Sequence, residues 1–205
     1  GPIVQEIIDR PGWMPGNSIA FMMKGEDQGP SDDENAREFE SFENIADPED
    51  GGDGKHHPER VPKLVVYYSI PTTVFERTIM KTGEIVEDGD TINVSSDDAE
   101  QENNAIDALY DDDLDAGWEG EPDDQNVLTT GLRFQNIAIP KGVHIDSAYI
   151  LVHSHEGKTV DDVAKITIVG NDVDDAVTFN ETDLISDRKE TTESLLWTVD
   201  KKWEI

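Results

Sequence analysis

The residues best able to do chemistry in this chain are carboxylates, and the first group of them is Asp97-Asp98-Ala99-Glu100. In an extended backbone alternate side chains point the same way, so Asp98 and Glu100 share one side and Asp97 takes the other. A bend here would gather two or three carboxylates around one ion. Because a ligand set of oxygens alone suits Ca²⁺, we predict a calcium site. The alternative is a capped turn with surface acids.

Four aspartates in five residues, Asp111-Asp112-Asp113-Leu114-Asp115, form the second group. They lack the regular alternation and the fixed glycine of an EF-hand loop, so they are no such motif. With Asp111, Asp113 and Asp115 as ligands, they would make a weak divalent site of the millimolar class found in extracellular modules. A third group begins at Asn171-Asp172, where oxygen-bearing side chains alternate after an expected strand; a polar hairpin turn is the alternative that we favour there.

His153 and His155 are two positions apart, which places both imidazoles on one side of a strand. Such a pair can chelate zinc or copper. A third nitrogen or sulfur ligand is lacking within reach in the sequence, apart from His144 or the pair His56-His57. We therefore favour exposed histidines at the end of a strand over a transition-metal site.

Sugar binding and catalysis have weaker signals. Trp118, between Gly117 and Glu119, is the tryptophan best placed for an exposed platform that stacks on a sugar, but no second aromatic residue is close to it. Nucleophilic catalysis is disfavoured because the chain has no Cys and no serine in a Gly-x-Ser-x-Gly elbow. We expect a protein without enzymatic activity.

The chain as a whole is strongly acidic, with 47 Asp and Glu against 16 Lys and Arg in 205 residues and a formal charge of -31. This balance excludes binding to nucleic acid or an anionic membrane through a basic face, and no apolar run is long enough to insert into a bilayer. Without cysteine, a chain that is 35% apolar needs metal ions, oligomerisation or both to stabilise a modest core. Calcium or high salt would also relieve the repulsion between carboxylates.

The acids are concentrated in two stretches. Residues 26–54 hold 12 of them and residues 97–124 hold 13. Since Gly, Pro and Asp favour turns and such a composition cannot bury a face, we predict long acidic loops over 26–60 and 97–126. A solvated or disordered surface is the alternative for each stretch.

The remaining segments have the pattern of short strands, rich in β-branched and aromatic residues and bounded by Gly, Pro or Asp. They span 18–24, 63–68, 127–139, 147–153, 164–169 and 195–199. Only 3–10 looks helical, because Ile3, Val4, Ile7 and Ile8 recur on one face and Pro11-Gly12 ends the pattern. The prediction is an all-β protein, an antiparallel jelly-roll-like β-sandwich with one short N-terminal helix.

Several separated blocks carry a family resemblance. The helical block ends in Arg10-Pro11-Gly12-Trp13 and is followed by blocks at 37–42 and 62–68, while further blocks lie at 94–100, 130–150, 166–171 and 194–197. Together they resemble the repeated β-sandwich domain of large secreted bacterial surface and adhesive proteins. Because the Asp97-Asp98-Ala99-Glu100 block and the Glu40-Ser41 block both recur in that family, the resemblance implies that they meet, with Glu40 at the cation site.

The order of the blocks is swapped relative to that family. The closing half of the sandwich spans 1–68, a connector spans 69–91 and the opening half spans 92–205. Either the chain straddles a boundary in a tandem array, or each half finds its complement. Completion within one chain gives a permuted sandwich, and completion between chains gives head-to-tail filaments.

These observations lead to one expected function and two alternatives. We expect a secreted prokaryotic protein, extracellular or at the cell surface, whose structural or adhesive β-sandwich is stabilised by calcium and has copies of itself or adjacent repeats as partners. The first alternative is a carbohydrate-binding module of a larger secreted protein, with a polysaccharide as partner and Trp118 as its contact. The second is a salt-adapted version of either, in which no specific ion binds.

Overall fold

The computed structural model describes residues 1–26, 35–45, 53–69, 73–87, 90–121, 124–155 and 163–201. A single α-helix, α1 (Pro2–Ile8), and a 3-10 turn, η2 (Ile185–Asp187), accompany the strands of this part of the chain. The strands are β1 (Ile19–Gly25), β2 (Asn35–Glu40), β3 (Lys63–Ser69), β4 (Thr73–Thr78), β5 (Gly83–Glu87), β6 (Asp90–Val94), β7 (Asp98–Glu102), β8 (Ala105–Ala108), β9 (Asp113–Glu121), β10 (Asp124–Phe134), β11 (His144–Leu151), β12 (Ala164–Asn171) and β13 (Glu190–Val199).

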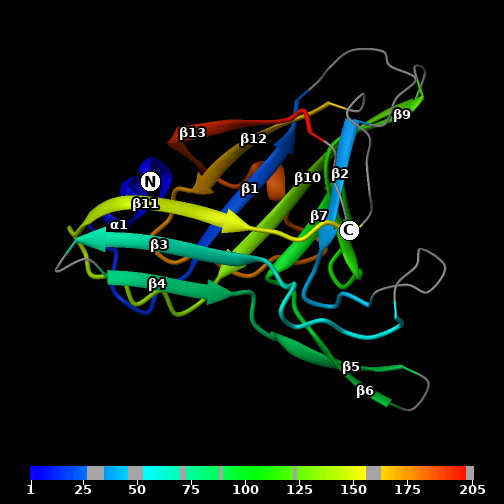
Figure 1. Ribbon diagram of the computed structural model, residues 1–205, viewed down its shortest axis with the longest axis horizontal. Helices are drawn as coiled ribbons and strands as arrows, with labels where there is room; N and C mark the ends of the chain where they lie inside the picture. The colour runs from blue at the N-terminus through cyan, green and yellow to red at the C-terminus, as the bar shows by residue number, and fades with distance from the viewer. Residues whose placement is uncertain are drawn as a thin grey trace.

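The strands form two stacked sheets and a separate hairpin (Figure 1). The large sheet has the order β13-β12-β1-β10-β7-β8, and β9 joins β10 to β2. The small sheet has the order β11-β3-β4, and β5 pairs with β6. Every pairing is antiparallel. The prediction of an all-β antiparallel sandwich with one short helix is confirmed.

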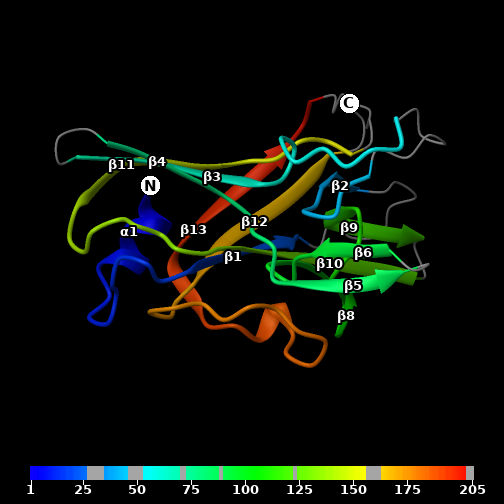
Figure 2. The same ribbon diagram turned by 90° about the horizontal axis from the view of Figure 1, so that it is seen from below.

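The central strand β1 is buried on both faces, and this explains its unbroken apolar run. Phe21 and Met23 pack into the main core between the sheets, whereas Ala20 and Met22 face a second cluster around Phe179. Figure 2 shows the large sheet between the small sheet and the segment that carries η2. Each fully buried side chain of this size stabilises the fold by about 1.5–3 kcal/mol relative to an exposed position.

Strands from both ends of the chain alternate in these sheets. From region 1–68, β1 lies between β10 and β12 of region 92–205, and β3 pairs with β11 in the small sheet. The two regions therefore share one core within this chain. Segment 69–91, expected as a connector, includes β4, which completes the small sheet, and β5.

The prediction of a loop over 97–126 is wrong, because these residues form β7, β8, β9 and the start of β10. Along β9 the buried side chains of Leu114, Ala116 and Trp118 stand at every second position. This is the period of a β-strand, and the acidic residues in the same segment concealed it. In the other predicted loop, 26–60, residues 35–40 form β2. Residues 27–34 and 46–52 of that loop lie outside the described residues.

Two glycines let β9 cross the end of β1 at close range. A Cβ atom on Gly25 would lie 1.7 Å from the carbonyl oxygen of Gly117, and a Cβ on Gly117 would lie 2.4 Å from the carbonyl oxygen of Asn35. Gly117 also has a φ of +139°, which side-chain-bearing residues rarely adopt. These two glycines let β9, together with its partner β2, pass close to the end of β1.

Among the described residues, no helix is long and apolar enough to cross a membrane.

Candidate metal centre

The ribbon formed by β2 and β9 carries carboxylates on one side and core residues on the other. Its register places Glu38 opposite Asp115 and Glu40 opposite Asp113, while the intervening Phe39 is fully buried in the main core. Like charges directly opposite each other destabilise a strand pair. Protonation of these carboxylates, or a cation bound beside them, would remove this repulsion.

Strand β7 adds two more carboxylates to this ribbon. Oδ2 of Asp98 accepts a hydrogen bond of 2.6 Å from the backbone N–H of Phe42, and Oε2 of Glu100 accepts one of 2.6 Å from the N–H of Asp115. Asp98 is 2% exposed and Glu100 is 7% exposed. The block with Asp98 and Glu100 thus lies against the segment that follows Glu40, an arrangement expected from the family resemblance.

Asp98 has one oxygen without a partner. Although the residue is almost fully buried, Oδ1 has no hydrogen-bond donor among the described residues. Burial, followed by the charge of Asp97, raises the pKa of Asp98 well above its usual range. A buried oxygen of this kind costs free energy unless it binds a proton or a cation.

Glu43 lies within electrostatic reach of Asp98 and Asp111. The pKa of Glu43 is raised, first by burial and then by the charge of Asp98, with a smaller effect from Asp111. Oε1 of Glu43 accepts a hydrogen bond from the backbone N–H of Ser95, which holds the side chain at this place. The charges of Asp98 and Asp111 thus both reach Glu43, and we call these three carboxylates the Asp98 cluster: Glu43, Asp98 and Asp111.

The aspartates at 111–113 form the adjoining acidic turn. One oxygen of each of Asp111, Asp112 and Asp113 lies within 4.8 Å of the others. The pKa of Asp112 is raised by burial and by a hydrogen bond shared with the carboxyl of Asp111. Ser41 fixes this turn, because its Oγ donates to the carbonyl of Asp111 at 2.6 Å and its N–H donates to the carbonyl of Asp112 at 3.3 Å.

The acidic layer continues between β7 and β9. Burial, and then the charges of neighbouring acids, raise the pKa of Glu100 to about 8 and that of Asp115 to about 9. The pKa of Asp113 is raised by burial, while the charge of His155 lowers it. Oδ1 of Asp115 is buried without a hydrogen-bond partner. Chemically, this layer can take up protons or divalent cations with oxygen ligands.

Of the residues predicted as metal ligands, six lie in this layer. They come from β2, β7, β9 and the turn before β9: Glu40, Asp98, Glu100, Asp111, Asp113 and Asp115. Glu43 was missed, because a single acid in an irregular segment has no pattern that distinguishes it from surface acids.

Asp97 points away from this layer and has protein partners instead. Oδ1 of Asp97 accepts a hydrogen bond from Arg133 at 2.6 Å and one from the hydroxyl of Thr178 at 2.8 Å. Oδ2 accepts one from Gln135 at 2.5 Å. Because the side chain is 0% exposed, this network fully satisfies a buried charge inside the sandwich.

The structure does not bring Asn171 and Asp172 to the acidic layer. Asp172 forms ion pairs with Arg10 and Lys189, and these partners lower its pKa, Lys189 having the largest effect. The Asn171 amide donates to the carbonyl of Lys189 at 2.9 Å. These contacts join the end of β12 to the segment after α1 and to the residue before β13.

The prediction of an exposed sugar platform at Trp118 is wrong. The residue is only 6% exposed, because the alternation of β9 directs it to the same face as Leu114 and Ala116. Trp118 is therefore not available as the exposed sugar contact that the carbohydrate-binding alternative required.

The expectation of exposed histidines at a strand end is also wrong for His155. Its side chain is 10% exposed, and its Nδ1 lies 3.7 Å from Oε2 of Glu40. His153 instead directs its Nδ1 to the carbonyl of Arg60 at 3.2 Å. The two imidazoles thus have different partners and do not form one chelate.

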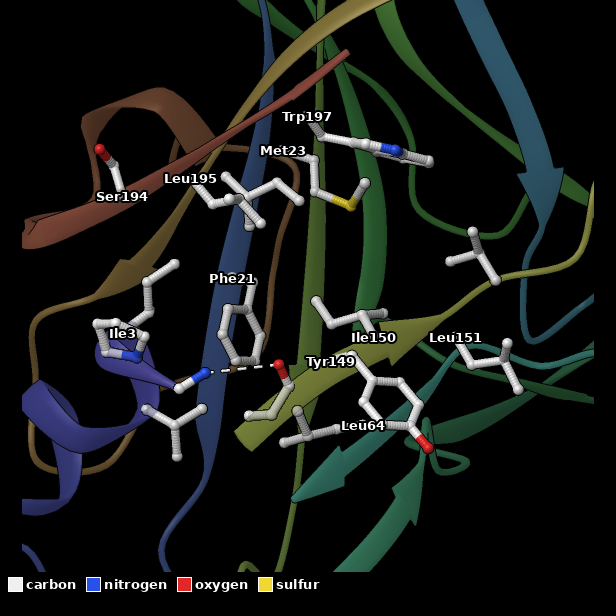
Figure 3. A pocket seen from close by; sticks show the side chains of 16 residues that line it. Ile3, Phe21, Met23, Leu64, Tyr149, Ile150, Leu151, Ser194, Leu195 and Trp197 are labelled. Carbon is white, nitrogen blue, oxygen red and sulfur yellow. Dashed lines mark hydrogen bonds between the residues drawn. The ribbon is translucent and has the colours of Figure 1, made fainter. Parts of the chain in front are cut away.

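A separate apolar groove lies where the free edges of the two sheets meet, at β11 and β13. It has a volume of about 560 Å³. Figure 3 shows Phe21, Met23, Ile150, Leu195 and Trp197 around this space. None of its lining residues carries a carboxylate: they are Gly1, Pro2, Ile3, Val4, Phe21, Met23, Leu64, Ala148, Tyr149, Ile150, Leu151, Val152, Ile168, Ser194, Leu195 and Trp197.

No protein-family model matches the chain, and no curated protein or solved structure shows significant similarity to it. The resemblance to secreted bacterial β-sandwich repeats therefore stays a prediction.

Proposed function

We propose that this protein is a non-enzymatic structural β-sandwich that binds calcium at the Asp98 cluster. The observation that carries the proposal is the buried Oδ1 of Asp98, which has no hydrogen-bond donor among the described residues and belongs to a carboxylate whose charge acts on Glu43. Ca²⁺ prefers oxygen ligands of this kind. Asp98, Glu43 and Asp111 are the proposed ligands.

The ion would act as a cross-link between distant parts of the chain. Asp98 belongs to β7, Glu43 to the segment after β2, and Asp111 to the turn before β9. In the absence of the ion, burying Asp98 and part of Glu43 costs free energy, because each loses hydration and repels the other. A cation that binds only the folded state stabilises it by mass action.

The proposed location follows from the affinity expected of such a site. Sites built from few carboxylates in extracellular modules have dissociation constants of about 10⁻⁴–10⁻³ M, so they fill only where calcium is abundant. We therefore place the protein outside the cell or at the surface of a prokaryotic cell. Its role there is mechanical: a rigid sandwich in a structural or adhesive assembly.

For assembly we propose contact between copies of this chain through the groove between β11 and β13. Copies that carry a charge of -31 repel each other, so they approach best where carboxylates are lacking, as in the lining of this groove. Large apolar side chains at its rim are half exposed: Tyr149 at 48%, Leu151 at 44% and Leu195 at 56%. An apolar rim of this kind marks an interaction surface.

Thermal unfolding of the purified chain with and without calcium tests the metal-binding proposal. The measurement is made after chelation at low ionic strength, and Mg²⁺ is the control for general screening. A rise in melting temperature with Ca²⁺ that exceeds the rise with equal Mg²⁺ supports the site. An equal response to both ions, or none, contradicts it.

A further inference from the structure

We propose that Glu40, His155 and Asp113 hold a second, different metal ion, a divalent transition metal for which Zn²⁺ is the reference ion. This site does not depend on the calcium proposal, because its ligands belong to different side chains. It differs from a chelate formed by His153 and His155, because only His155 takes part in it.

The backbone places the imidazole beside the carboxylate ribbon. The N–H of Glu40 donates to the carbonyl of His153 at 2.9 Å, and the N–H of His155 donates to the carbonyl of Glu38 at 3.1 Å. Phe39 and Ser154 form the antiparallel bridge between these bonds. Residues 153–155 thus extend β2 on one edge while β9 pairs with the other. Glu40 is therefore flanked by Asp113 on one side and by this histidine-bearing segment on the other.

Two potential ligand atoms face each other here, and neither has a hydrogen-bond partner among the described residues. They are Oε2 of Glu40 and Nδ1 of His155, both buried and 3.7 Å apart. The side chains are 2% and 10% exposed, respectively. A separation of 3.7 Å is too long for a hydrogen bond. Two ligands of one zinc ion, each about 2.0–2.1 Å from the metal, lie about 3.3 Å apart at the tetrahedral angle, so a few tenths of an ångström of movement would complete the pair.

Asp113 would supply the third ligand by turning its side chain, because the ligand atoms of Glu40, His155 and Asp113 do not all lie within 4.8 Å of one another. It stands directly opposite Glu40 in the β2–β9 register. It also lies within electrostatic reach of His155, whose charge opposes the effect of burial on this carboxyl group. Imidazole nitrogen and carboxylate oxygen are both ligands of Zn²⁺, and a nitrogen ligand distinguishes this set from a calcium site.

An outer contact orients the carboxylate. Arg60 donates from Nη1 to Oε1 of Glu40 at 2.8 Å, which directs Oε2 toward the imidazole. Metal-binding carboxylates usually have such a second partner, and it fixes their orientation. The rival explanation is a simple ion pair between protonated His155 and Glu40, in which no metal takes part.

The experiment is a titration of the full chain with Zn²⁺ and Co²⁺ after chelation and dialysis. Calorimetry measures zinc binding, the visible absorption of Co²⁺ reports its coordination, and NMR of ¹⁵N-labelled histidine identifies the imidazole that binds. We expect one site, a shift of the Nδ1 resonance of His155, and at least a tenfold loss of zinc affinity in His155→Gln and Glu40→Gln. The matched control is His144→Gln, because the side chain of His144 is 78% exposed and should leave binding unchanged.

Two outcomes overturn the proposal. One is a wild-type chain in which zinc leaves the His155 resonance unmoved; this readout does not require any variant to fold. The other is zinc binding that survives His155→Gln and is lost in His57→Gln, which would assign it to the exposed side chains around His57. Asp98→Asn should keep zinc binding while it loses the calcium response, so the failure of either proposal is recognised separately.

Discussion

The backbone N–H of Phe42 donates a 2.6 Å hydrogen bond to Oδ2 of Asp98, 56 positions later in the chain. The other oxygen of this carboxylate, Oδ1, is buried and has no donor in the part of the chain that the structure describes. One side chain thus joins the end of β2 to β7 and still has an oxygen left for a ligand. Its substitution is the most direct test of the calcium proposal.

We predict that Asp98→Asn abolishes the calcium-dependent stabilisation. In the wild-type chain, 10 mM Ca²⁺ should raise the free energy of unfolding by about 1.4–2.7 kcal/mol for a dissociation constant of about 10⁻³–10⁻⁴ M. The amide keeps the shape of the side chain but not its charge. Urea unfolding with Ca²⁺ and with chelator measures the difference.

The control for this substitution is Asp187→Asn, which removes an exposed acid of η2 on the outer side of the large sheet. It should leave the calcium response at the wild-type value. Equal calcium responses in Asp98→Asn and wild type would show that the ion binds elsewhere.

Asp97→Asn should lower the stability of the protein but keep its response to calcium, whereas Asp98→Asn should lose that response. Its carboxylate pairs with Arg133 inside the sandwich, and removing one partner of a buried ion pair costs about 3–5 kcal/mol. Because Asp97 lies outside the acidic layer, calcium should still stabilise this variant. The same urea measurements test this; a variant of wild-type stability that no longer responds to calcium would contradict it.

In chelator, stability should fall as pH rises from about 5 to 9. Glu100 and Asp115 have pKa values of about 8 and about 9 in the folded protein, whereas in the unfolded chain such groups titrate near pH 4. Over this range the folded state therefore binds more protons than the unfolded state, so the free energy of unfolding decreases with pH.

Urea midpoints at pH 5, 7 and 9, at constant ionic strength, measure this decrease. Glu100→Gln keeps an oxygen to accept the N–H of Asp115 and removes one titrating group, so the decrease should be smaller in this variant. Stability that rises over the same range would mean that these carboxylates are ionised and well paired in the folded state.

Leu195→Glu should weaken any association between copies, and Leu196→Glu should not. The two side chains are equally exposed, at 56% and 57%, but only Leu195 lines the groove. A carboxylate there would place charge in an apolar contact between acidic chains. Sedimentation velocity of the three proteins over a range of concentrations compares their masses. A wild-type chain that stays monomeric throughout contradicts the proposed assembly.

Much of the fold followed from local pattern. The apolar run from Ile19 to Met23 predicted β1, the i, i+4 spacing of Val4 and Ile8 predicted α1, and the β-branched segment at 63–68 predicted β3. These assignments succeed because the period of burial is written into consecutive residues. The same reasoning failed for β9, where acidic residues at every other position concealed an equally regular alternation.

The acidic layer was only half predictable. The sequence by itself determined that the carboxylates of Asp98 and Glu100 share one side of an extended segment, and that the chain has few cations with which to pair them. The tertiary structure alone decided that Asp98 and Asp111 lie within electrostatic reach of Glu43, that Arg133 pairs with Asp97, and that His155 is buried against Glu40. No local period connects these neighbours, because they belong to different strands and turns. Strand pairing determines which charges meet, and burial determines the free-energy cost of each contact.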